Sequence, residues 1–407
     1  MQPHYRFAGF MGKRVHLGVT GSIAAYKSLD LLRSLQESGC LVSATITESA
    51  AEFVRPLSFE ALGASPVYGN MFDGSPSGSA FGHLEPGQVG DVMVIAPATA
   101  ATMARLAFGL ADDMLSCQAL AFPGPKIVAP AMNPRMWNAP ATQRNLDMLG
   151  DLGYTRVLPA CGHVACGDIG SGRLAPVDEI FIAVLRALAP QDLSGKKVMV
   201  TLGPTREPWD AVRFWSNPSS GLMGACMAMA AYLRGADVTV VAGPTALTFP
   251  DAITVCPVTT AREMFDAATG LWSDMDMACC TAAVADFCPK PYGDTKFKKA
   301  SGAGEGITVE FMPNPDILRT LGESKKDGQK LIGFAAETGN VKAEAERKLK
   351  SKHLDLLAAN DVSREGSGFG TATNEMFVIN ASGRMETWPQ LDKTEVAWRL
   401  WDHLLLD

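Results

Sequence analysis

The stretch KIVAPAMNPRMW, residues 126–137, decides how the first part of this chain folds. It opens with a mostly apolar run of the kind that lies buried in a parallel sheet. The run ends in Met132, Asn133 and Pro134, so an amide side chain stands where a strand gives way to a helix. Because ligands of parallel α/β sheets bind at the carboxyl ends of the strands, we expect Asn133 to face a ligand.

Strand and helix patterns alternate on both sides of this stretch. A helical pattern over residues 21–39 ends at Gly39, and another begins at about Met136. Strand patterns in this half lie at residues 13–20, 41–47, 90–99, 126–132 and 155–160. Strands separated by helices predict a doubly wound α/β domain around a parallel sheet.

The segment 186–197 interrupts this alternation with proline, aspartate, serine and glycine, and we place a domain boundary near Leu193. Beyond it the alternation resumes, with strand patterns at residues 196–203, 236–243, 253–258, 275–283, 330–337, 354–360 and 374–380. The sequence therefore predicts two α/β domains, residues 1–190 and residues 191–407. The polar, glycine-rich stretch 293–307 is predicted to be a mobile loop.

The composition narrows the classes of partner and compartment. The 407 residues carry a net charge of −7 without a long basic run, which argues against nucleic acid. No apolar run approaches the roughly 20 residues of a membrane span, and the N-terminus reads as a short extension rather than a signal peptide. The 9 cysteines follow no disulfide framework and predict a reducing, cytoplasmic compartment. The motif CGHVAC, residues 161–166, lacks the second Cys or His pair of a zinc site.

The motif GVTGSIAAYK, residues 18–27, is a strand end, a turn and a helix start. Helix N-termini bind phosphate through unpaired N–H groups and the helix dipole. The spacing from Gly18 to Gly21 differs from GxGxxG, which weakens the case for a dinucleotide, and GxxxxGK[ST] does not occur in the sequence. A phosphate turn and an ordinary βα turn both remain open at this position.

Other polar residues in the first half each have two interpretations. Thr99, in APAT, follows another strand and places a hydroxyl at the same sheet edge. Asp112 and Asp113 are interpreted as helix-capping or solvated acids. A lone histidine such as His83 is more often structural than catalytic. Cys166, in ACGDIGSGRLAP, belongs either to a flexible lid carrying a reactive thiol or to an inert surface loop.

Polar clusters in the second half suit an anionic ligand. Arg206, Arg213 and Asn217 precede a Ser-Ser-Gly helix start, which is typical of polyanion binding. Asp286 follows an apolar strand. The lysines of KFKK, residues 296–299, either form a solvated charge cluster or close over a triphosphate and neutralise it.

The order and number of these motifs, taken together, carry a resemblance. In the first half they are GSIAAYK, APATA, PAMNPRMW and ACGDIGSGRL; in the second they are GPTREPWDAVRFWSNPSSG, KFKK, GFAAET and AANDV. The chain resembles, from about Lys13 to its end, the bifunctional bacterial phosphopantothenoylcysteine decarboxylase/phosphopantothenate–cysteine ligases of coenzyme A biosynthesis. The resemblance implies two Rossmann-like domains, a flavodoxin-like domain of the flavin-dependent Cys decarboxylases (the HFCD family) and a ligase domain.

For the first half the resemblance implies flavin mononucleotide (FMN) as cofactor. The positions matching the phosphate turn and the flavin surroundings are Gly21, Ser22, Ile23, Thr47, Ala98, Thr99 and Ser116. His83 matches the acid/base, and Cys166 matches the thiol that donates the last proton. Asn133 would hold the substrate carboxylate by hydrogen bonds, because an amide orients this anion without the strong neutralisation that would oppose its loss.

For the second half the resemblance implies that CTP activates 4′-phosphopantothenate as an acyl-cytidylate, which cysteine then attacks. The matching positions are Asn217, Asp286, Lys296, Lys299, Phe334, Lys348 and Lys352. Mg²⁺ is expected on the CTP phosphates, with its protein ligands unassigned. The resemblance further implies a homo-oligomer, a dodecamer built from trimeric contacts of the flavin half, with its site between subunits, and dimeric contacts of the ligase half.

Some positions depart from the family pattern. Asp112 stands where asparagine is common, Leu222 where lysine is common in SSGKMG, and Cys288 where arginine is usual. Pro86 follows closely after His83. Three rival interpretations are a related flavin protein whose second half has lost ligase activity, a flavin-binding carrier or regulatory protein, and a nicotinamide oxidoreductase.

Overall fold

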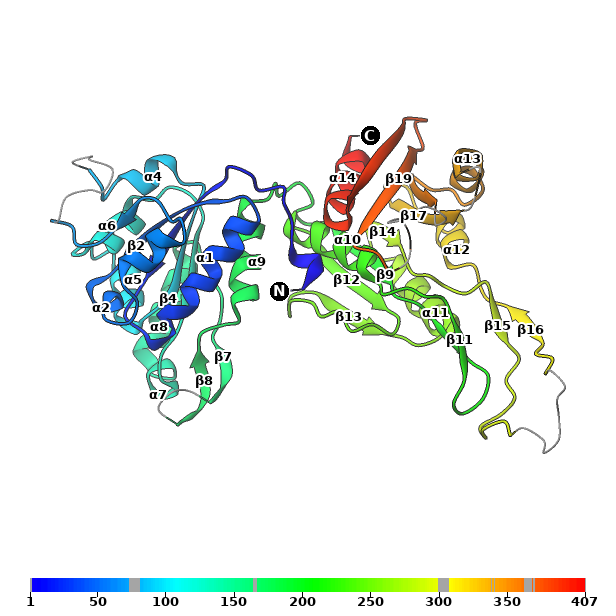
Figure 1. Cartoon of the computed structure of the whole chain (residues 1–407), viewed down its shortest axis with the longest axis horizontal. Helices are drawn as coiled ribbons and strands as arrows, with labels where there is room; N and C mark the ends of the chain where they lie inside the picture. Colours follow the sequence, from blue (N-terminus) through cyan, green and yellow to red (C-terminus); the bar gives the residue numbers. More distant parts are fainter. Residues whose placement is uncertain are drawn as a thin grey trace. The chain divides into compact units, whose positions relative to one another are not determined.

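The computed structural model describes residues 2–72, 81–163, 167–298, 307–337, 339, 341–361, 368 and 370–406. The chain divides into two compact units (Figure 1). The first unit is Phe7–Ala189, and the second consists of Pro190–Asp407 together with the N-terminal residues Met1–Arg6. The sequence grouped residues 1–6 with the first half. In the structure the short 3₁₀ helix η1 (Pro3–Tyr5) instead packs on helix α10 (Leu222–Leu233) of the second unit.

In the described part of the first unit, six parallel strands form one sheet in the order β3-β2-β1-β4-β5-β6. They are β1 (Arg14–Val19), β2 (Leu41–Ile46), β3 (Val67–Tyr68), β4 (Val92–Ala98), β5 (Lys126–Pro130) and β6 (Tyr154–Arg156). The sheet is the predicted doubly wound parallel sheet. Its order reverses between β1 and β4, which makes the carboxyl ends of these strands the expected ligand crevice.

Helices cover both faces of this sheet (Figure 1). Helices α1 (Lys27–Glu37) and α9 (Val177–Leu188) pack together on one face. The other face carries α5 (Ala100–Phe108), α6 (Met114–Ala121) and α8 (Pro140–Asp151), whose apolar residues share a core with β4. The shorter elements of this unit are η2 (Ile23–Tyr26), α2 (Glu48–Ala51), α3 (Pro56–Ala61), α4 (Glu85–Val89), α7 (Pro134–Trp137) and the antiparallel pair β7 (Ala160–His163) and β8 (Ile169–Arg173).

Two helix boundaries differ from the sequence predictions. The helix predicted over residues 21–39 consists of η2 followed by α1, which ends at Glu37 before Gly39 in the left-handed region (φ 86°). The helix predicted from about Met136 is two helices, α7 and α8. Pro134 and Pro140 each begin one of them, because proline suits the first position of a helix.

Within the described residues, the second unit contains an eight-stranded sheet in the order β13-β12-β9-β14-β17-β18-β19-β20. Its strands are β9 (Lys197–Leu202), β12 (Asp237–Ala242), β13 (Thr254–Pro257), β14 (Met277–Cys280), β17 (Lys330–Glu337), β18 (Leu356–Asp361), β19 (Thr373–Asn380) and β20 (Met385–Asp392). The strands from β13 to β18 are parallel, whereas β19 and β20 add antiparallel pairs at one edge. The switch point lies between β9 and β14.

Helices α10 (Leu222–Leu233) and α14 (Lys393–Leu405) pack together in this unit, with α10 against β9. Helices α11 (Ala261–Trp272), α12 (Ile317–Glu323) and α13 (Val341–Ser351) contribute to another core, with Trp272, Leu321 and Leu349 buried. No described helix has the length and apolar character needed to cross a membrane.

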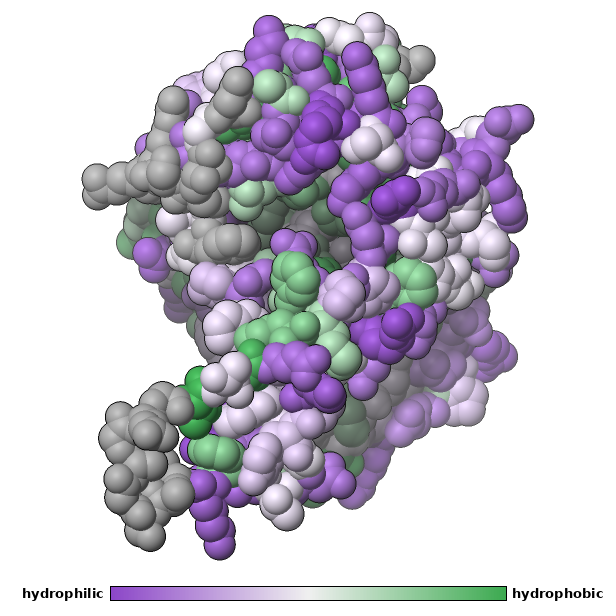
Figure 2. Space-filling model, turned by 90° about the vertical axis from the view of Figure 1, so that its right-hand side faces the viewer, coloured by the Kyte–Doolittle hydropathy of each residue, from purple (hydrophilic) through white to green (hydrophobic). Residues whose placement is uncertain are grey.

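Two short antiparallel pairs project from this unit, β10 (Arg206–Pro208) with β11 (Phe214–Ser216), and β15 (Phe287–Pro289) with β16 (Phe311–Pro313). They carry exposed aromatic residues, among them Trp215 and Phe287. Figure 2 shows hydrophobic side chains gathered across the middle of an otherwise largely hydrophilic face. The loop predicted over residues 293–307 lies between β15 and β16, and its residues 299–306 fall outside the described residues.

Candidate active sites at the strand ends of the two units

Thr20, just after β1, forms hydrogen bonds that link the ends of β1 and β4 at the switch point of the first unit. Its hydroxyl donates a hydrogen bond to the Pro97 carbonyl at 2.7 Å and accepts one from the Thr99 backbone N–H at 3.0 Å. The ends of β1 and β4 are therefore held side by side, as a crevice at this position requires.

The turn that follows Thr20 has the properties of a phosphate cradle. A Cβ added to Gly21 would lie 2.4 Å from Cβ of Ser49, so a side chain here would push α2 away. Among the described residues, the backbone N–H groups of Gly21 and Ile23 have no hydrogen-bond partner. Both residues line a cavity of about 440 Å³. The turn thus fits the phosphate of FMN, to which unpaired N–H groups donate.

Asn133 lines the same cavity, as expected from its place at a strand end. Its Oδ1 accepts a hydrogen bond from the Arg135 N–H at 2.8 Å, which caps α7. Its Nδ2 donates to Oδ2 of Asp168 at 2.9 Å. The amide oxygen therefore fixes the side chain on the helix, while the amide nitrogen already binds a carboxylate. This is the contact expected for a substrate carboxylate, here made by a residue of the chain itself.

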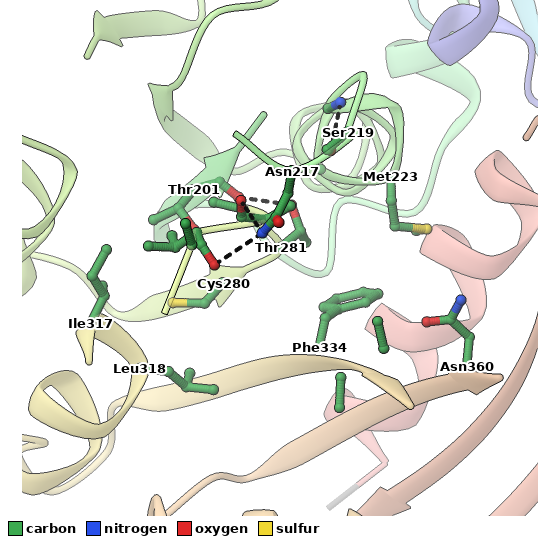
Figure 3. Close-up of a pocket in the computed structure, with 18 of the residues that line it drawn as sticks. Thr201, Asn217, Ser219, Met223, Cys280, Thr281, Ile317, Leu318, Phe334 and Asn360 are labelled. Atoms are coloured by element: carbon green, nitrogen blue, oxygen red, sulfur yellow. Dashed lines mark hydrogen bonds between the residues drawn. The ribbon is translucent and has the colours of Figure 1, made fainter. Parts of the chain in front are cut away.

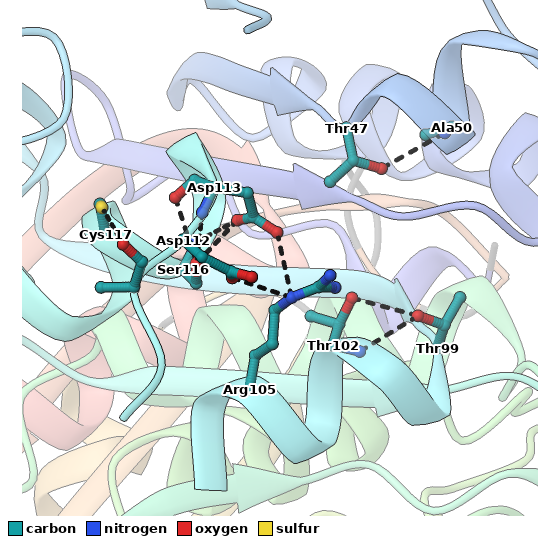
Figure 4. Close-up of polar contacts among 10 residues, drawn as sticks. Thr47, Ala50, Thr99, Thr102, Arg105, Asp112, Asp113, Ser116 and Cys117 are labelled. Carbon is teal, nitrogen blue, oxygen red and sulfur yellow. Dashed lines mark hydrogen bonds and ion pairs between the residues drawn. The ribbon is translucent and has the colours of Figure 1, made fainter. Parts of the chain in front are cut away.

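Three of the predicted flavin-contacting hydroxyls take part in helix capping (Figure 4). Thr47 and Thr99 accept hydrogen bonds from the first turns of α2 and α5, each at 3.3 Å. Ser116 forms a reciprocal capping box with Asp113, whose Oδ1 accepts from the Ser116 N–H at 2.7 Å. The interpretation of Asp113 as a helix cap is confirmed, and Asp112 pairs with Arg105 at 3.0 Å.

The cavity in the described residues collects part of the predicted set. It includes Gly21, Ser22, Ile23, Thr99 and Asn133. Thr47, Ala98, Ser116 and His83 do not line it, and Cys166 lies outside the described residues. His83 is half-buried before α4, in whose first turn Pro86 lies. Lys27 and Arg173 also line the cavity, although no sequence prediction named them.

A buried polar network beneath the His83 loop was not foreseen from the sequence. His16, on β1, is fully buried and hydrogen-bonds Thr45 at 2.9 Å and Gln118 at 3.2 Å. Gln118 in turn donates to the carbonyl of Gly82, next to His83, at 3.1 Å. Burial outweighs the hydrogen bond to Gln118 and lowers the pKa of His16 to about 4.

In the second unit, a cavity of about 520 Å³ lies at the carboxyl ends of the parallel strands (Figure 3). Among the described residues it brings together the predicted Asn217, Asp286, Phe334, Lys348 and Lys352. Nδ2 of Asn217 donates to the carbonyls of Ala283 and Val284 at 3.2 and 3.3 Å. The connection before α10 is thereby fastened to the loop that follows β14.

Helix α10 is held close to the floor of this cavity. A Cβ added to Gly224 would lie 2.2 Å from Oγ1 of Thr281 and 2.5 Å from Cβ of Leu202, so only glycine permits the approach. The first turn of α10 therefore opens beside the ends of β9 and β14. Leu222 lines the cavity and contributes no charge to that turn.

The loop that carries Lys296 is anchored from the β10–β11 hairpin. Oδ2 of Asp210 accepts a hydrogen bond from the Phe297 backbone N–H at 3.0 Å, and its Oδ1 accepts from Val212 and Arg213 at 2.8 and 2.6 Å. Burial opposes the charge, but these N–H donors and the Arg213 guanidinium hold the pKa of Asp210 down at about 2. Lys296 itself is exposed and does not line the cavity, and Lys299 lies outside the described residues.

Two Rossmann-like units with ligand crevices at their switch points define a two-domain α/β protein whose first unit is suited to a flavin. Family models agree with this class: "Flavoprotein" matches residues 10–189, and "DNA/pantothenate metabolism flavoprotein C-terminal domain" matches residues 193–406.

Relatives match nearly the whole chain. The coenzyme A biosynthesis bifunctional protein CoaBC of Bacillus subtilis (strain 168) is 40% identical over 392 residues, covering 95% of each chain. That of Escherichia coli (strain K12) is 41% identical over 373 residues, covering 91% of this chain and 92% of its own. The chain belongs to this family of bifunctional coenzyme A biosynthesis proteins.

Two solved structures are each similar to part of the chain. A crystal structure of the C-terminal domain of a CoaBC protein is 38% identical, with a TM-score of 0.45, and covers 53% of this chain and 96% of its own. A PPC decarboxylase mutant complexed with pantothenoylaminoethenethiol is 36% identical, with a TM-score of 0.38, and covers 42% of this chain and 96% of its own.

Proposed function

We propose that the chain catalyses two consecutive steps of coenzyme A biosynthesis. Cysteine is first ligated to 4′-phosphopantothenate at the expense of CTP, and the product is then decarboxylated with FMN to 4′-phosphopantetheine. We assign decarboxylation to residues 1–190 and ligation to residues 191–407. The observation that carries the proposal is the presence of a crevice at each switch point, in a chain that aligns with bifunctional relatives over 95% of its length.

In the first unit, the chain's own groups bind and orient the reactants. The N–H groups of Gly21 and Ile23 hold the FMN phosphate, and Asn133 orients the carboxylate of the cysteine moiety. FMN, when bound, supplies the hydride acceptor and donor that make this carboxylate able to leave. His83 serves as acid and base at the first stage, and Cys166 donates the final proton to carbon.

In the second unit, the carboxylate of 4′-phosphopantothenate attacks the α-phosphorus of CTP and releases pyrophosphate. The amine of cysteine then attacks the acyl-cytidylate and releases CMP. Asn217 orients the acyl intermediate, Asp286 and Phe334 lie at the nucleotide, and Lys348 and Lys352 contact the triphosphate. Lys296 and Lys299 contribute positive charge at the phosphates, and Mg²⁺ would add further charge neutralisation there.

The flavin site requires a second copy of the chain in this proposal. His83 does not line the cavity that contains Asn133 in its own subunit, which supports its acting in a site shared with a neighbour. The second unit carries exposed aromatic residues on its projecting strand pairs, such as Trp215, and these support contacts between the second units of neighbouring copies. Sedimentation velocity tests this; the proposed dodecamer gives a single species twelve times the 43.2 kDa chain mass, whereas a monomer refutes it.

The decisive experiment is the product analysis of a reaction containing 4′-phosphopantothenate, cysteine, CTP and Mg²⁺, read by mass spectrometry. Appearance of 4′-phosphopantetheine with CMP supports both activities. If the product stops at phosphopantothenoylcysteine, the ligase assignment holds and the assigned roles of His83, Asn133 and Cys166 fail. If CTP is not consumed, the flavin-binding carrier becomes the better interpretation.

A further inference from the structure

The lysines that line the cavity of the second unit differ in how their charge is balanced. Lys348 pairs with Glu337, and Lys352 pairs with Asp316 at 2.9 Å. The third lysine among the described lining residues is Lys393, the first residue of α14. No carboxylate in the described part of the chain forms an ion pair with its ammonium.

Lys393 is also the most deeply buried of these three lysines, with 5% of the residue exposed. Its Nζ donates hydrogen bonds to the carbonyls of Thr371 and Gly368, at 2.7 and 3.2 Å. These two bonds orient the ammonium without neutralising it, and burial lowers the pKa of Lys393. A buried cation without a counter-ion is costly, and an anion bound in the cavity would remove that cost.

A chain of contacts places this ammonium at the α10 end of the cavity. Lys393 bonds to the Gly368 carbonyl, and the Gly368 N–H donates to Oδ1 of Asn374 at 3.1 Å. Nδ2 of Asn374 lies 3.7 Å from the sulfur of Met223, in the first turn of α10. Figure 3 shows the Met223 side chain on the side of the pocket away from Ile317 and Leu318. Lys393 therefore lies beside the first turn of a 12-residue helix, where N–H groups and the helix dipole favour an anion.

Lys352 serves the opposite end of the cavity. Its partner, Asp316, caps α12, the helix that contains Ile317 and Leu318. In Figure 3, these two residues lie across the pocket from Met223. A substrate that carries anionic groups at both ends could thus meet a different cation at each end.

From this arrangement we propose that Lys393 binds the phosphate monoester of 4′-phosphopantothenate, together with the first turn of α10. This inference rests on the ligase function proposed above and adds the residue that recognises the phosphate of the acyl substrate. Leu222 supplies no charge to that turn, so Lys393 brings the cation from a different helix. Recognition of the phosphate distinguishes 4′-phosphopantothenate from unphosphorylated pantothenate.

The test compares Lys393→Met, which keeps most of the length of the side chain without its charge, with Lys393→Arg, which keeps the charge. We expect Lys393→Met to raise KM for 4′-phosphopantothenate about 10- to 100-fold, the range for a charge-assisted hydrogen bond. KM for CTP should change less than twofold, and Lys393→Arg should recover part of the loss. Lys325→Met is the matched control, because Lys325 is partly buried, pairs with Asp355 and does not line the cavity.

Three outcomes would overturn the inference while the wild-type chain remains an active ligase. They are unchanged KM values for both substrates, a rise confined to KM for CTP, and equal losses in the Met and Arg variants with a lowered unfolding temperature. The first excludes a role in binding, the second assigns Lys393 to the nucleotide, and the third makes Lys393 structural. Absence of ligation in the wild type would instead refute the proposed function itself.

Discussion

Asn133 shows how one side chain can be shaped for an anion by its backbone surroundings. Its amide oxygen is occupied by the first turn of α7, so only the amide nitrogen is directed to a carboxylate. An aspartate would fill the capping role equally well, since both residues are good helix caps. The difference between the two side chains therefore isolates the anion-binding role from the structural one.

Asn133→Asp should abolish decarboxylation, which we take as a fall in turnover of at least about 100-fold. The reason is that the new carboxylate repels both the substrate carboxylate and Asp168. The measurement is turnover of supplied phosphopantothenoylcysteine, with flavin absorbance as the check on folding. The control is Asn138→Asp, an exposed position at the end of the same helix. A fully active Asn133→Asp variant would refute the role of this amide.

We expect His16 to make the stability of the first unit sensitive to acid. Its pKa is lowered from the ordinary 6.5 to about 4, so the folded state favours the neutral ring. Its contribution to stability is complete above about pH 6.5 and is lost as the pH falls toward 4, by roughly 1.4 kcal/mol per pH unit. His16→Leu should flatten the pH dependence of urea unfolding in this window. An unchanged slope would mean that other groups cause the acid sensitivity.

At the scale of elements, the β10–β11 hairpin holds the loop that carries the predicted lysine cluster. Asp210 accepts the Phe297 N–H, and the Phe297 ring lies 5.2 Å from both Trp209 and Tyr292, centroid to centroid. The residue between Lys296 and Lys298 is thus fixed by the hairpin, while the lysines on either side of it stay exposed.

Asp210→Asn should slow cysteine ligation about tenfold. Both carboxylate oxygens of Asp210 accept hydrogen bonds, whereas an amide offers only one acceptor oxygen, so the loop that carries Lys296 would lose part of its anchor. Decarboxylation of supplied phosphopantothenoylcysteine should not change. Adding Lys296→Gln should cause little further loss if Asp210 acts through that lysine, whereas fully additive losses would contradict the link. Asp251→Asn, at an exposed position, serves as the control.

At the scale of the whole molecule, the start of the chain belongs structurally to the second unit. His4 is fully buried, its Nε2 lies 2.9 Å from the Thr248 carbonyl, and Tyr5 donates to the same oxygen at 2.8 Å. Thr245, in the same loop, donates to the carbonyl of Ser220 before α10. The N-terminal segment thus supports the loop that in turn contacts the start of this helix.

Deletion of residues 2–6 in the otherwise complete chain should therefore lower the unfolding midpoint of the second unit by about 5 °C, through the loss of two buried side chains. Flavin binding should be retained, because the first unit keeps its own core. Differential scanning calorimetry with flavin absorbance separates the two effects. A drop in flavin content with an unchanged second unit would contradict the assignment.

The sequence predicted most strands of the two large sheets and missed β3 and β20, whereas it missed more of the elements around them. Apolar runs such as residues 126–132 are long enough to show periodicity, whereas β10, β11, β15 and β16 have three residues each and were missed. The helix predicted from about Met136 failed because the two prolines at 134 and 140 each begin a separate helix. Caps such as Asp113 were predicted correctly, since donor and acceptor lie within four residues of each other.

For the candidate sites as well, predictions were better for residues at strand ends than for residues in connecting segments. Residues directly after strands, such as Gly21 and Asn133, reach their cavity because the ends of neighbouring parallel strands meet at one edge. His83 and Lys296, which lie in connecting segments, do not line the cavities of the described chain.

The order of elements, the strand-end residues and the family motifs follow from local sequence, because each depends on side chains close together along the chain. The close approach of Ser49 to Gly21, the anchoring of Phe297 by Asp210 and the burial of Lys393 beside the cavity come from folding alone. Each joins segments far apart in sequence, where no pattern of neighbouring residues records the contact. Hydrophobic burial of the sheets brings these segments together, and only then do their charges and hydrogen bonds acquire partners.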